Sequence, residues 1–291
     1  MEFTLPVLIV QHIRRMRGGA QSHLMLGADG HLYVVKFRNN PQHERVLVNE
    51  MLATRLAAAA GLTVPETEVV EVPEWLVEHS PEMTVDLGRR CEPCRAGLNF
   101  GARYVGGLMP GQVMDYLPEQ QLGEVRNLAE FAGILALDKW VGNADKRQAV
   151  FKREARERRY TAVFIDQGFC FNAGEWQFED APLRGVYPRN AVYARVTGWE
   201  SFEPWLSRME AMAVETIWAT AEAIPPEWYG GDVVDIELLV EMLYRRRGRI
   251  RELVESFANS GTMPFPEFEK RCPTSVVGKS ELNKKEKLVL Q

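Results

Sequence analysis

The chain has 291 residues, of which 46% are hydrophobic and 26% are charged, as in ordinary globular proteins. This length corresponds to one large domain or two small ones. The 35 basic and 40 acidic residues leave a net charge of −5, which argues against a generally basic nucleic-acid-binding protein. Four cysteines are too few for a fold built on disulfides and fit a reducing compartment better.

The chain contains no apolar stretch of about 18 residues that would predict a membrane-spanning helix. The apolar run Leu5–Val10 is followed by arginines, whereas a signal peptide carries its positive charges before the apolar core. We therefore expect a cytoplasmic protein without a membrane partner. Cys91 and Cys94 form a CxxC with no second pair nearby, so free thiols are expected there instead of a zinc site.

The first 112 residues show the short β-prone runs of a small α+β region. Strands are expected at the following runs: Val7–Ile13, Ser22–Leu26, His31–Phe37 and Thr67–Val72. Between the last two, apolar residues recur with helical spacing from Glu44 to Ala59, and Gly61 supplies a stop. Residues 73–112 repeat Gly and Pro without a period, which predicts irregular structure.

Beyond residue 112 the pattern is mostly helical. Val113–Leu117 is expected to be a short extended crossing, and Ala162–Ile165 a short strand. Helices are expected over the following ranges: Leu122 to about Val141, Trp205–Ala223 and Val233–Phe257. These elements predict a two-lobed α+β fold, with a sheet-rich N-lobe over 1–112, a hinge and helical C-lobe over 113–258, and a flexible tail over 259–291.

The predicted N-lobe contains three features suited to binding phosphate. Small residues between two predicted strands let backbone N–H groups face an anion, in the loop Gly18, Gly19, Ala20, Gln21 and Ser22. Lys36 interrupts an apolar strand and could hold phosphate oxygens as a point charge, and Glu50 could pair with it from the first helix. The alternatives are a plain hairpin turn, an edge-strand lysine and an exposed helix residue.

Two acidic residues in the second half suit a base and a metal ligand. Asp145 lies in a polar loop after a helical stripe, and Asp166 ends a short apolar strand. One carboxylate would orient a hydroxyl nucleophile, and the other would hold Mg²⁺ against nucleotide phosphates. The alternative for each is a simple turn residue.

Five segments in this order resemble the HipA-like kinases, bacterial serine/threonine kinases with a fold related to protein kinases and phosphoinositide lipid kinases. They are GGAQS, VVKF, NEMLATRLAAAAGLTVPE, DKWVGNADKRQ and FIDQG, within residues 15–172. The resemblance implies a kinase-like fold and the ATP- and Mg²⁺-dependent transfer of the γ-phosphoryl group to a serine or threonine hydroxyl of a protein. A nucleotide and a protein substrate are thus the implied partners.

The resemblance also implies roles for individual residues. Gly18–Ser22 would cover the phosphates, Lys36 would contact them, and Glu50 would be the helix partner of that lysine. Asp145 would be the catalytic base, and Asp166 would be the metal ligand. The hinge at Val113–Leu117 would meet adenine through its backbone, which involves the following residues: Met114, Asp115, Tyr116 and Leu117.

One departure from the family bears on activity. Val150 stands where the family has a second metal ligand, usually Asn, five residues after the catalytic Asp. Gln148 or Asn143 could substitute through a carbonyl oxygen, as a hard ligand for Mg²⁺. The alternatives to an active protein kinase are therefore a degenerate pseudokinase that binds a nucleotide or a partner, and a small-molecule kinase.

Overall fold

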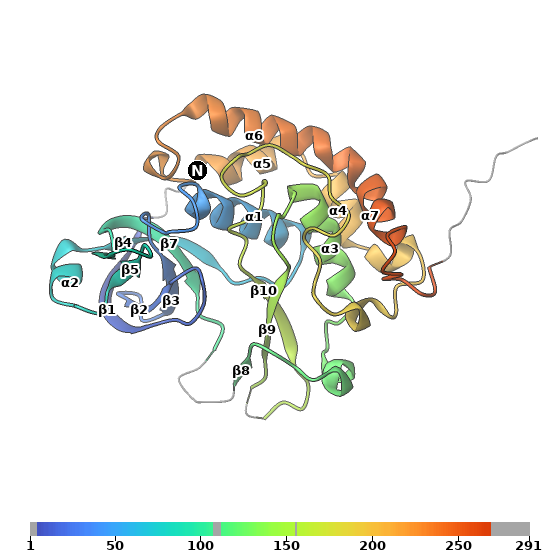
Figure 1. The fold of residues 1–291 in the computed structure, drawn as a ribbon, viewed down its shortest axis with the longest axis horizontal. Helices are drawn as coiled ribbons and strands as arrows, with labels where there is room; N and C mark the ends of the chain where they lie inside the picture. The colour runs from blue at the N-terminus through green and yellow to red at the C-terminus, as the bar shows by residue number, and fades with distance from the viewer. Residues whose placement is uncertain (1–4, 107–111, 155, 269–291) are drawn as a thin grey trace, which may run out of the picture.

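The computed structural model describes residues 5–106, 112–154 and 156–268 (Figure 1). A small β-barrel formed by the N-terminal region lies beside a larger helical region, and a three-stranded sheet extends along the helical region (Figure 1). The mixed composition, with sheet at the N-terminal end and helices towards the C-terminal end, confirms the α+β class predicted from the sequence.

Five strands form the closed barrel, in the spatial order β1-β2-β3-β7-β4. Their bounds are β1 Val7–Arg15, β2 His23–Gly27, β3 Leu32–Lys36, β4 Thr67–Val72 and β7 Gly97–Arg103. The barrel closes because β1 pairs in parallel with β4, while the other neighbours are antiparallel. Inward-facing residues such as Ile9, Met25 and Val35 fill its interior.

Strand β3 is hydrogen-bonded on both sides, to β2 and to β7, and Lys36 lies opposite Phe100. The edge-strand alternative for Lys36 is therefore wrong. Helix α1, Val46–Ala60, follows β3 and ends at Gly61, as the sequence predicts. Nearly every residue of α1 is buried, because the helix packs against the barrel on one side and against other helices on the other (Figure 1).

The predicted irregular segment contains regular structure in its described part. Helix α2, Glu74–Glu78, precedes a hairpin of β5, Thr84–Asp86, and β6, Cys91–Pro93, and then the barrel strand β7. The sequence analysis missed β7 because its two glycines interrupt the β-prone pattern, and tertiary pairing overrides weak local propensity.

The three-stranded sheet has the order β10-β9-β8, with β8 Val113–Met114, β9 Gln148–Lys152 and β10 Thr161–Ile165. The extended crossing and the last strand were predicted, whereas β9 was not, because polar and charged residues flank it. In the antiparallel register, Gln148 lies opposite Ile165 and Met114 lies opposite Phe151. Pairing through β9 therefore joins the crossing to the strand that precedes Asp166.

The helical region contains α3 and four further helices. Their bounds are α3 Glu130–Val141, α4 Trp205–Glu210, α5 Val214–Glu222, α6 Val233–Arg246 and α7 Ile250–Ala258. Each of the two long predicted helices is divided into two shorter ones. The helix predicted over 205–223 is interrupted at 211–213, where Ala213 is extended, and the one predicted over 233–257 is interrupted by a 3₁₀ turn around Gly248. The helix predicted from Leu122 begins at Glu130, because residues 119–124 form a 3₁₀ turn and Val125 bridges to Tyr160.

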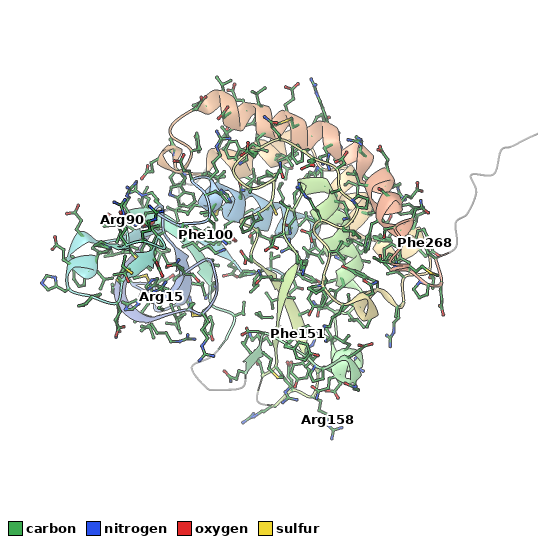
Figure 2. All side chains as sticks on the ribbon, in the orientation of Figure 1. Arg15, Arg90, Phe100, Phe151, Arg158 and Phe268 are labelled. Atoms are coloured by element: carbon green, nitrogen blue, oxygen red, sulfur yellow. The ribbon has the colours of Figure 1, made fainter. Side chains whose placement is uncertain are left out.

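The segment after α7 packs against the helical region. Phe265 is 7% exposed and contacts the rings of Tyr193, Phe202 and Phe257. Phe268 lies at the edge of the helical region, against Phe265 and a tryptophan ring (Figure 2). Residues 259–268 of the predicted flexible tail thus pack against the helical region through these two phenylalanines, and its remainder, 269–291, lies outside the described residues. Within the described ranges, no helix is long and apolar enough to cross a bilayer.

We predict that Phe265→Ala lowers the free energy of unfolding by about 3 kcal/mol, because it leaves a cavity within an aromatic cluster. Glu267→Ala, two residues away and exposed, is the matched control and should change stability by less than about 0.5 kcal/mol. Urea denaturation of the full chain measures both. Equal stabilities of the two variants would contradict the packing of this segment.

Candidate active site

Lys36 lies at the centre of a buried charge cluster formed by three separate elements. Its Nζ donates hydrogen bonds to Glu50 Oε1, from α1, and to Asp166 Oδ1, just after β10, the latter at 2.8 Å. The side chains of Lys36 and Glu50 are less than a tenth exposed, and that of Asp166 is 18% exposed. The structure therefore brings together three residues that the sequence analysis singled out separately.

The cluster carries one ammonium and two carboxyl groups, and burial raises the pKa of Glu50 above its ordinary value. Burial alone would lower the pKa of Lys36, but attraction to Glu50 and Asp166 outweighs it and raises that pKa. Burial alone would raise the pKa of Asp166, but Lys36 outweighs it and lowers that pKa below its ordinary value. Asp166 therefore stays ionised in a buried position, which suits it to bind a cation.

The backbone and the neighbours of Asp166 fix its carboxylate. Its φ of 63° lies in the left-handed region, which Asp tolerates better than most residues and which turns the chain sharply after β10. Gln148 Nε2 donates to Asp166 Oδ2 at 2.7 Å, so a neighbouring strand supports the second oxygen. A backbone conformation of this kind is often found at functional sites.

Asn49, which the sequence analysis missed, holds the segment after Asp166 against α1. Its Nδ2 lies within 2.7–2.9 Å of the carbonyls of Gly168, Cys170 and Ala173, and its Oδ1 accepts the indole N–H of Trp176. The side chain is completely buried. A polar residue directly before Glu50, within a mostly apolar helix, is the signal that could have identified it.

A buried ion pair supports the loop that carries Asp145. Asp138 of α3 receives hydrogen bonds from Arg147 Nε, at 2.8 Å, and Arg147 Nη2, while Arg147 Nη1 donates to the carbonyl of Ile165 at 2.9 Å. Both side chains of the pair are fully buried. The loop is thus fixed to both α3 and the end of β10, while Asp145 itself is exposed at its surface. The sequence analysis missed the Asp138–Arg147 pair.

Asn143 and Gln148, the two predicted substitutes for a second metal ligand, have different environments. Asn143 is 1% exposed, and its amide is already used: Nδ2 donates to Asp138 Oδ1 and Oδ1 accepts the backbone N–H of Asp145. Its role is therefore to support the loop. Gln148 is exposed and directly contacts Asp166, which makes it the better placed of the two. Val150 is buried in β9, opposite Val163.

The loop Gly18–Ser22 connects β1 to β2, one strand away from Lys36. Asn40 Nδ2 donates to the carbonyl of Ala20 at 2.9 Å, and the Gln21 amide bridges the Arg15 guanidinium and the backbone of Asp86. The Gln21 side chain is therefore structural, and only its backbone is left for a ligand. Gly18 has a φ of +120°, and at both Gly18 and Gly19 the space that a Cβ atom would occupy is open. A ligand can therefore approach the backbone closely.

The predicted hinge residues differ in their surroundings. Met114 belongs to β8 and pairs with β9, while Asp115 and Tyr116 are exposed. Leu117 is buried, and its carbonyl accepts a hydrogen bond from Arg189. The predicted hinge begins in β8, which pairs with β9, the strand of Gln148. Strand β9 in turn pairs with β10, the strand that precedes Asp166.

Metal ligands among the described residues are few. No group of three or more His, Cys, Asp or Glu side chains in these ranges could hold a metal ion by itself. Mg²⁺ usually binds one or two carboxylates together with substrate phosphates and water. The carboxylate of Asp166 and an amide oxygen of Gln148 fit that pattern. Cys91, exposed on β6, and Cys94, buried, form no disulfide in the described part of the chain.

A family model described as HipA-like kinase matches residues 9–245 of the chain. No curated protein matches. Among solved structures, the chain is similar to the proinflammatory kinase CtkA of Helicobacter pylori, with a TM-score of 0.55 and 14% sequence identity. That similarity covers 89% of this chain and 98% of the CtkA chain, and at this identity it shows the fold alone.

Two other solved structures have lower scores. The Golgi casein kinase with Mn/ADP bound has a TM-score of 0.49 and 14% identity, covering 89% of this chain and 75% of its own. HipA of Shewanella oneidensis MR-1, in a complex with HipB and operator DNA, has a TM-score of 0.41 and 13% identity, covering 88% and 69%. These two similarities are too weak to support an inference about this chain.

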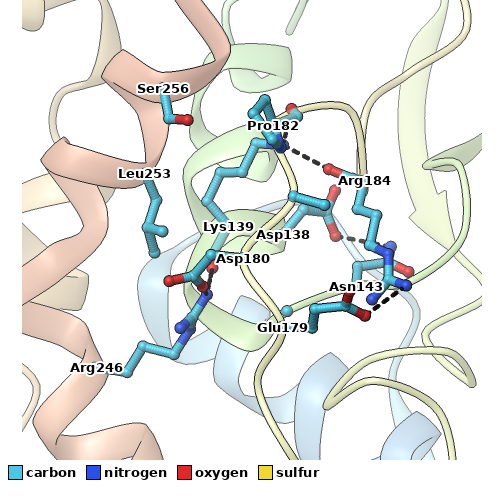
Figure 3. A pocket seen from close by; sticks show the side chains of 12 residues that line it. Asp138, Lys139, Asn143, Glu179, Asp180, Pro182, Arg184, Arg246, Leu253 and Ser256 are labelled. Carbon is cyan, nitrogen blue, oxygen red and sulfur yellow. Dashed lines mark hydrogen bonds and ion pairs between the residues drawn. The ribbon is translucent and has the colours of Figure 1, made fainter.

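Lys139 is a buried lysine behind the Asp145 loop. Its Nζ donates to the carbonyls of Pro182 and Arg184 at 2.7 and 2.5 Å, and holds the segment that contacts the loop (Figure 3). Gly185, next in this segment, donates its N–H to the carbonyl of Asp145 at 3.0 Å. Burial lowers the pKa of Lys139 to about 8.

Because the pKa of Lys139 is lower in the folded chain than in the unfolded one, we predict that its contribution to stability changes with pH. Below pH 8 both states bind the proton, and burying the ammonium costs stability. Between pH 8 and about 10.4 mainly the unfolded state binds the proton, so the free energy of unfolding rises with pH by up to about 3 kcal/mol. The unfolding free energies of the wild type and of Lys139→Met, measured at pH 7–10, should therefore depend on pH with different slopes.

Lys146→Met, at an exposed position, is the control. Parallel curves for Lys139→Met and the wild type would contradict the lowered pKa of Lys139.

We predict that Gly168→Ala disturbs the Lys36 cluster. A Cβ at Gly168 would lie 2.8 Å from Val46 Cγ2 and 3.1 Å from Glu50 Oε1, and both groups are buried on α1. We expect a loss of about 2 kcal/mol in unfolding free energy from overpacking. At Gly174 the added Cβ would have no neighbour closer than 3.4 Å, so Gly174→Ala is the matched control. Equal effects of the two substitutions would refute the close packing.

Proposed function

The chain belongs to the HipA-like kinase family, and we propose that it is a two-lobed, ATP- and Mg²⁺-dependent kinase that phosphorylates a serine or threonine hydroxyl of a protein. The observation that supports this most strongly is the buried ion-pair cluster of Lys36, Glu50 and Asp166. Three elements from different parts of the chain supply it, at a site where a cation and phosphates would complete the charge balance.

In this proposal the barrel and α1 form the N-lobe, over 1–112, and residues 113–258 form the hinge and the helical C-lobe. The segment 259–268 packs with the C-lobe through Phe265. ATP would lie between the lobes, with adenine against the backbone of Met114–Leu117 and the phosphates beneath the loop Gly18–Ser22. The Lys36 ammonium would hold phosphate oxygens, while Glu50 keeps that ammonium in place.

Asp166 and Gln148 would hold Mg²⁺. The Gln148 amide now presents its nitrogen to Asp166, and a half-turn of its terminal amide would present the oxygen instead. The metal, when bound, neutralises phosphate charge in the transition state. Asn143 is left out of this set because its amide is buried and engaged.

Asp145 would act on the acceptor. It is exposed on a rigid loop, so a hydroxyl can approach its carboxylate. Asp145 would accept the hydroxyl proton as the acceptor oxygen bonds to the γ-phosphorus and the bond to the bridging oxygen breaks, which releases ADP. Positioning by the buried Asp138–Arg147 pair would supply the fixed geometry that this step needs.

A pseudokinase is the second candidate, and the buried Val150 is the observation that favours it. A chain with a weakened metal site would bind a nucleotide and transfer nothing. Nucleotide binding and phosphoryl transfer must therefore be measured separately.

We predict that Asp145→Asn reduces phosphoryl transfer from radiolabelled ATP at least about a thousandfold while ATP binding, measured by calorimetry, changes by less than about threefold. Lys36→Met and Asp166→Asn should reduce both, because they remove groups that would contact the phosphates and the metal. Glu154→Gln, at an exposed position after β9, is the control and should retain activity.

The assay uses the full chain with and without Mg²⁺, and follows transfer both to the chain itself and to added protein acceptors. ATP binding without transfer by the wild type would favour the pseudokinase. Wild-type transfer that survives in Asp145→Asn would refute the role of Asp145, and a wild type that binds no ATP would overturn the proposal as a whole.

A further inference from the structure

Helices α5 and α6 lie on the outer side of the helical region (Figure 1), and an apolar groove lies between them. The groove has a volume of about 370 Å³ and is lined by Val214 and Trp218 from α5 and by Val234, Leu238 and Tyr244 from α6. Val234 is 61% exposed and Leu238 is 50% exposed. Apolar surface gathered into a groove of this kind marks an interaction site more often than scattered apolar residues do.

The two aromatic residues of the groove have unused hydrogen-bonding groups. Among the described residues, neither the indole N–H of Trp218 nor the hydroxyl of Tyr244 has a hydrogen-bond partner, and both side chains are half-buried. By contrast, four other tryptophans donate to an acceptor within the fold: Trp140, Trp176, Trp205 and Trp228. Half-buried Trp and Tyr side chains with a free polar end are typical anchors of protein interfaces.

The lining of the groove is acidic as well as apolar. Glu237 and Glu241 belong to it, one helical turn apart on α6. Glu241 pairs with Arg245, whereas Glu237 forms no ion pair with any described residue. The Arg247 guanidinium lies over the ring of Tyr244 at 4.1 Å, so the uncompensated negative charge is that of Glu237. An occupant with lysine or arginine beside its apolar residues would complement Glu237, and an acidic group at that place would be repelled.

The dimensions of the groove suit a helix. From Val234 to Tyr244 it follows ten residues of α6, which corresponds to about 15 Å, or about three helical turns. Two packed helices with an open apolar groove between them can accept a third along their length, which is an established mode of peptide recognition.

We propose that the α5–α6 groove binds a basic amphipathic helix of a partner protein. Leucine-like residues on one face of that helix contact Trp218 and Leu238, and a lysine or arginine beside them pairs with Glu237. This inference is independent of the proposed kinase activity, because the groove shares no lining residue with the Lys36 cluster.

The probe is a fluorescent 14-residue helical peptide with leucines at i, i+3, i+4 and i+7 and lysines flanking them. A matched peptide carries glutamate in place of every lysine. Fluorescence polarisation with the folded full chain should show saturable binding of the lysine peptide, and at least tenfold weaker binding of the glutamate peptide.

Variants of the full chain then locate the binding. Leu238→Asp should weaken the lysine peptide at least tenfold. Val233→Asp is the matched control, because Val233 is 53% exposed on the same helix but does not line the groove, and it should change affinity by less than twofold. The double substitution Glu237→Lys with Glu241→Lys should reverse the preference, so that the glutamate peptide binds more tightly.

Each opposite result overturns the proposal. No saturable binding of the lysine peptide, equal affinities of Leu238→Asp and Val233→Asp, or an unchanged preference in the charge-reversed variant would show that the groove is not this site. Sedimentation of the chain without peptide tests whether a second copy of the chain occupies the groove instead. Self-association that Leu238→Asp abolishes would show that it does.

Discussion

The hydrogen bonds that Lys36 donates to Glu50 and Asp166 are the interaction on which the candidate site depends. A buried ammonium is costly unless carboxyl groups accept its hydrogen bonds, and Glu50 and Asp166 both do so. The cluster therefore holds the barrel, α1 and the end of β10 at one point, where the lowered pKa of Asp166 keeps a carboxylate ionised. The fold and the proposed chemistry therefore both depend on the contacts among these three residues.

Two further buried polar groups keep the cluster and the Asp145 loop in fixed positions. The two N–H groups of the Asn49 amide are shared among three carbonyls of the segment after Asp166, and the carbonyl of Gly168 also contacts His43 Nε2 at 2.7 Å. Arg147 connects Asp138 of α3 with the carbonyl of Ile165, so the loop and the strand end cannot move independently. Neither group would contact a substrate in the proposal, yet together they place the residues that would.

The sequence predicted the elements whose patterns are local. The hairpin around Gly27–Gly30, helix α1 with its stop at Gly61 and the strand before Asp166 all have clear periods, and the structure contains them. Strand β9 pairs with the nearby β10 and was missed because polar and charged residues flank it. Strand β7 was missed because its partners β3 and β4 lie far away in the chain, so pairing decides it more than propensity does. Asn49 and the Asp138–Arg147 pair were missed for a similar reason: a single sequence does not show which buried polar residues will meet.

The register of β9 and β10 bears on the missing asparagine at Val150. Val150 lies opposite Val163, three residues before Asp166, whereas Gln148 lies opposite Ile165, directly beside it. Residues 148 and 150 share one face of β9, so an amide at 148 faces the same side but lies about 7 Å closer to the strand end. The longer glutamine side chain also reaches further than asparagine. An amide at position 148 is therefore better placed beside Asp166 than one at 150 would be, as the proposed metal site requires.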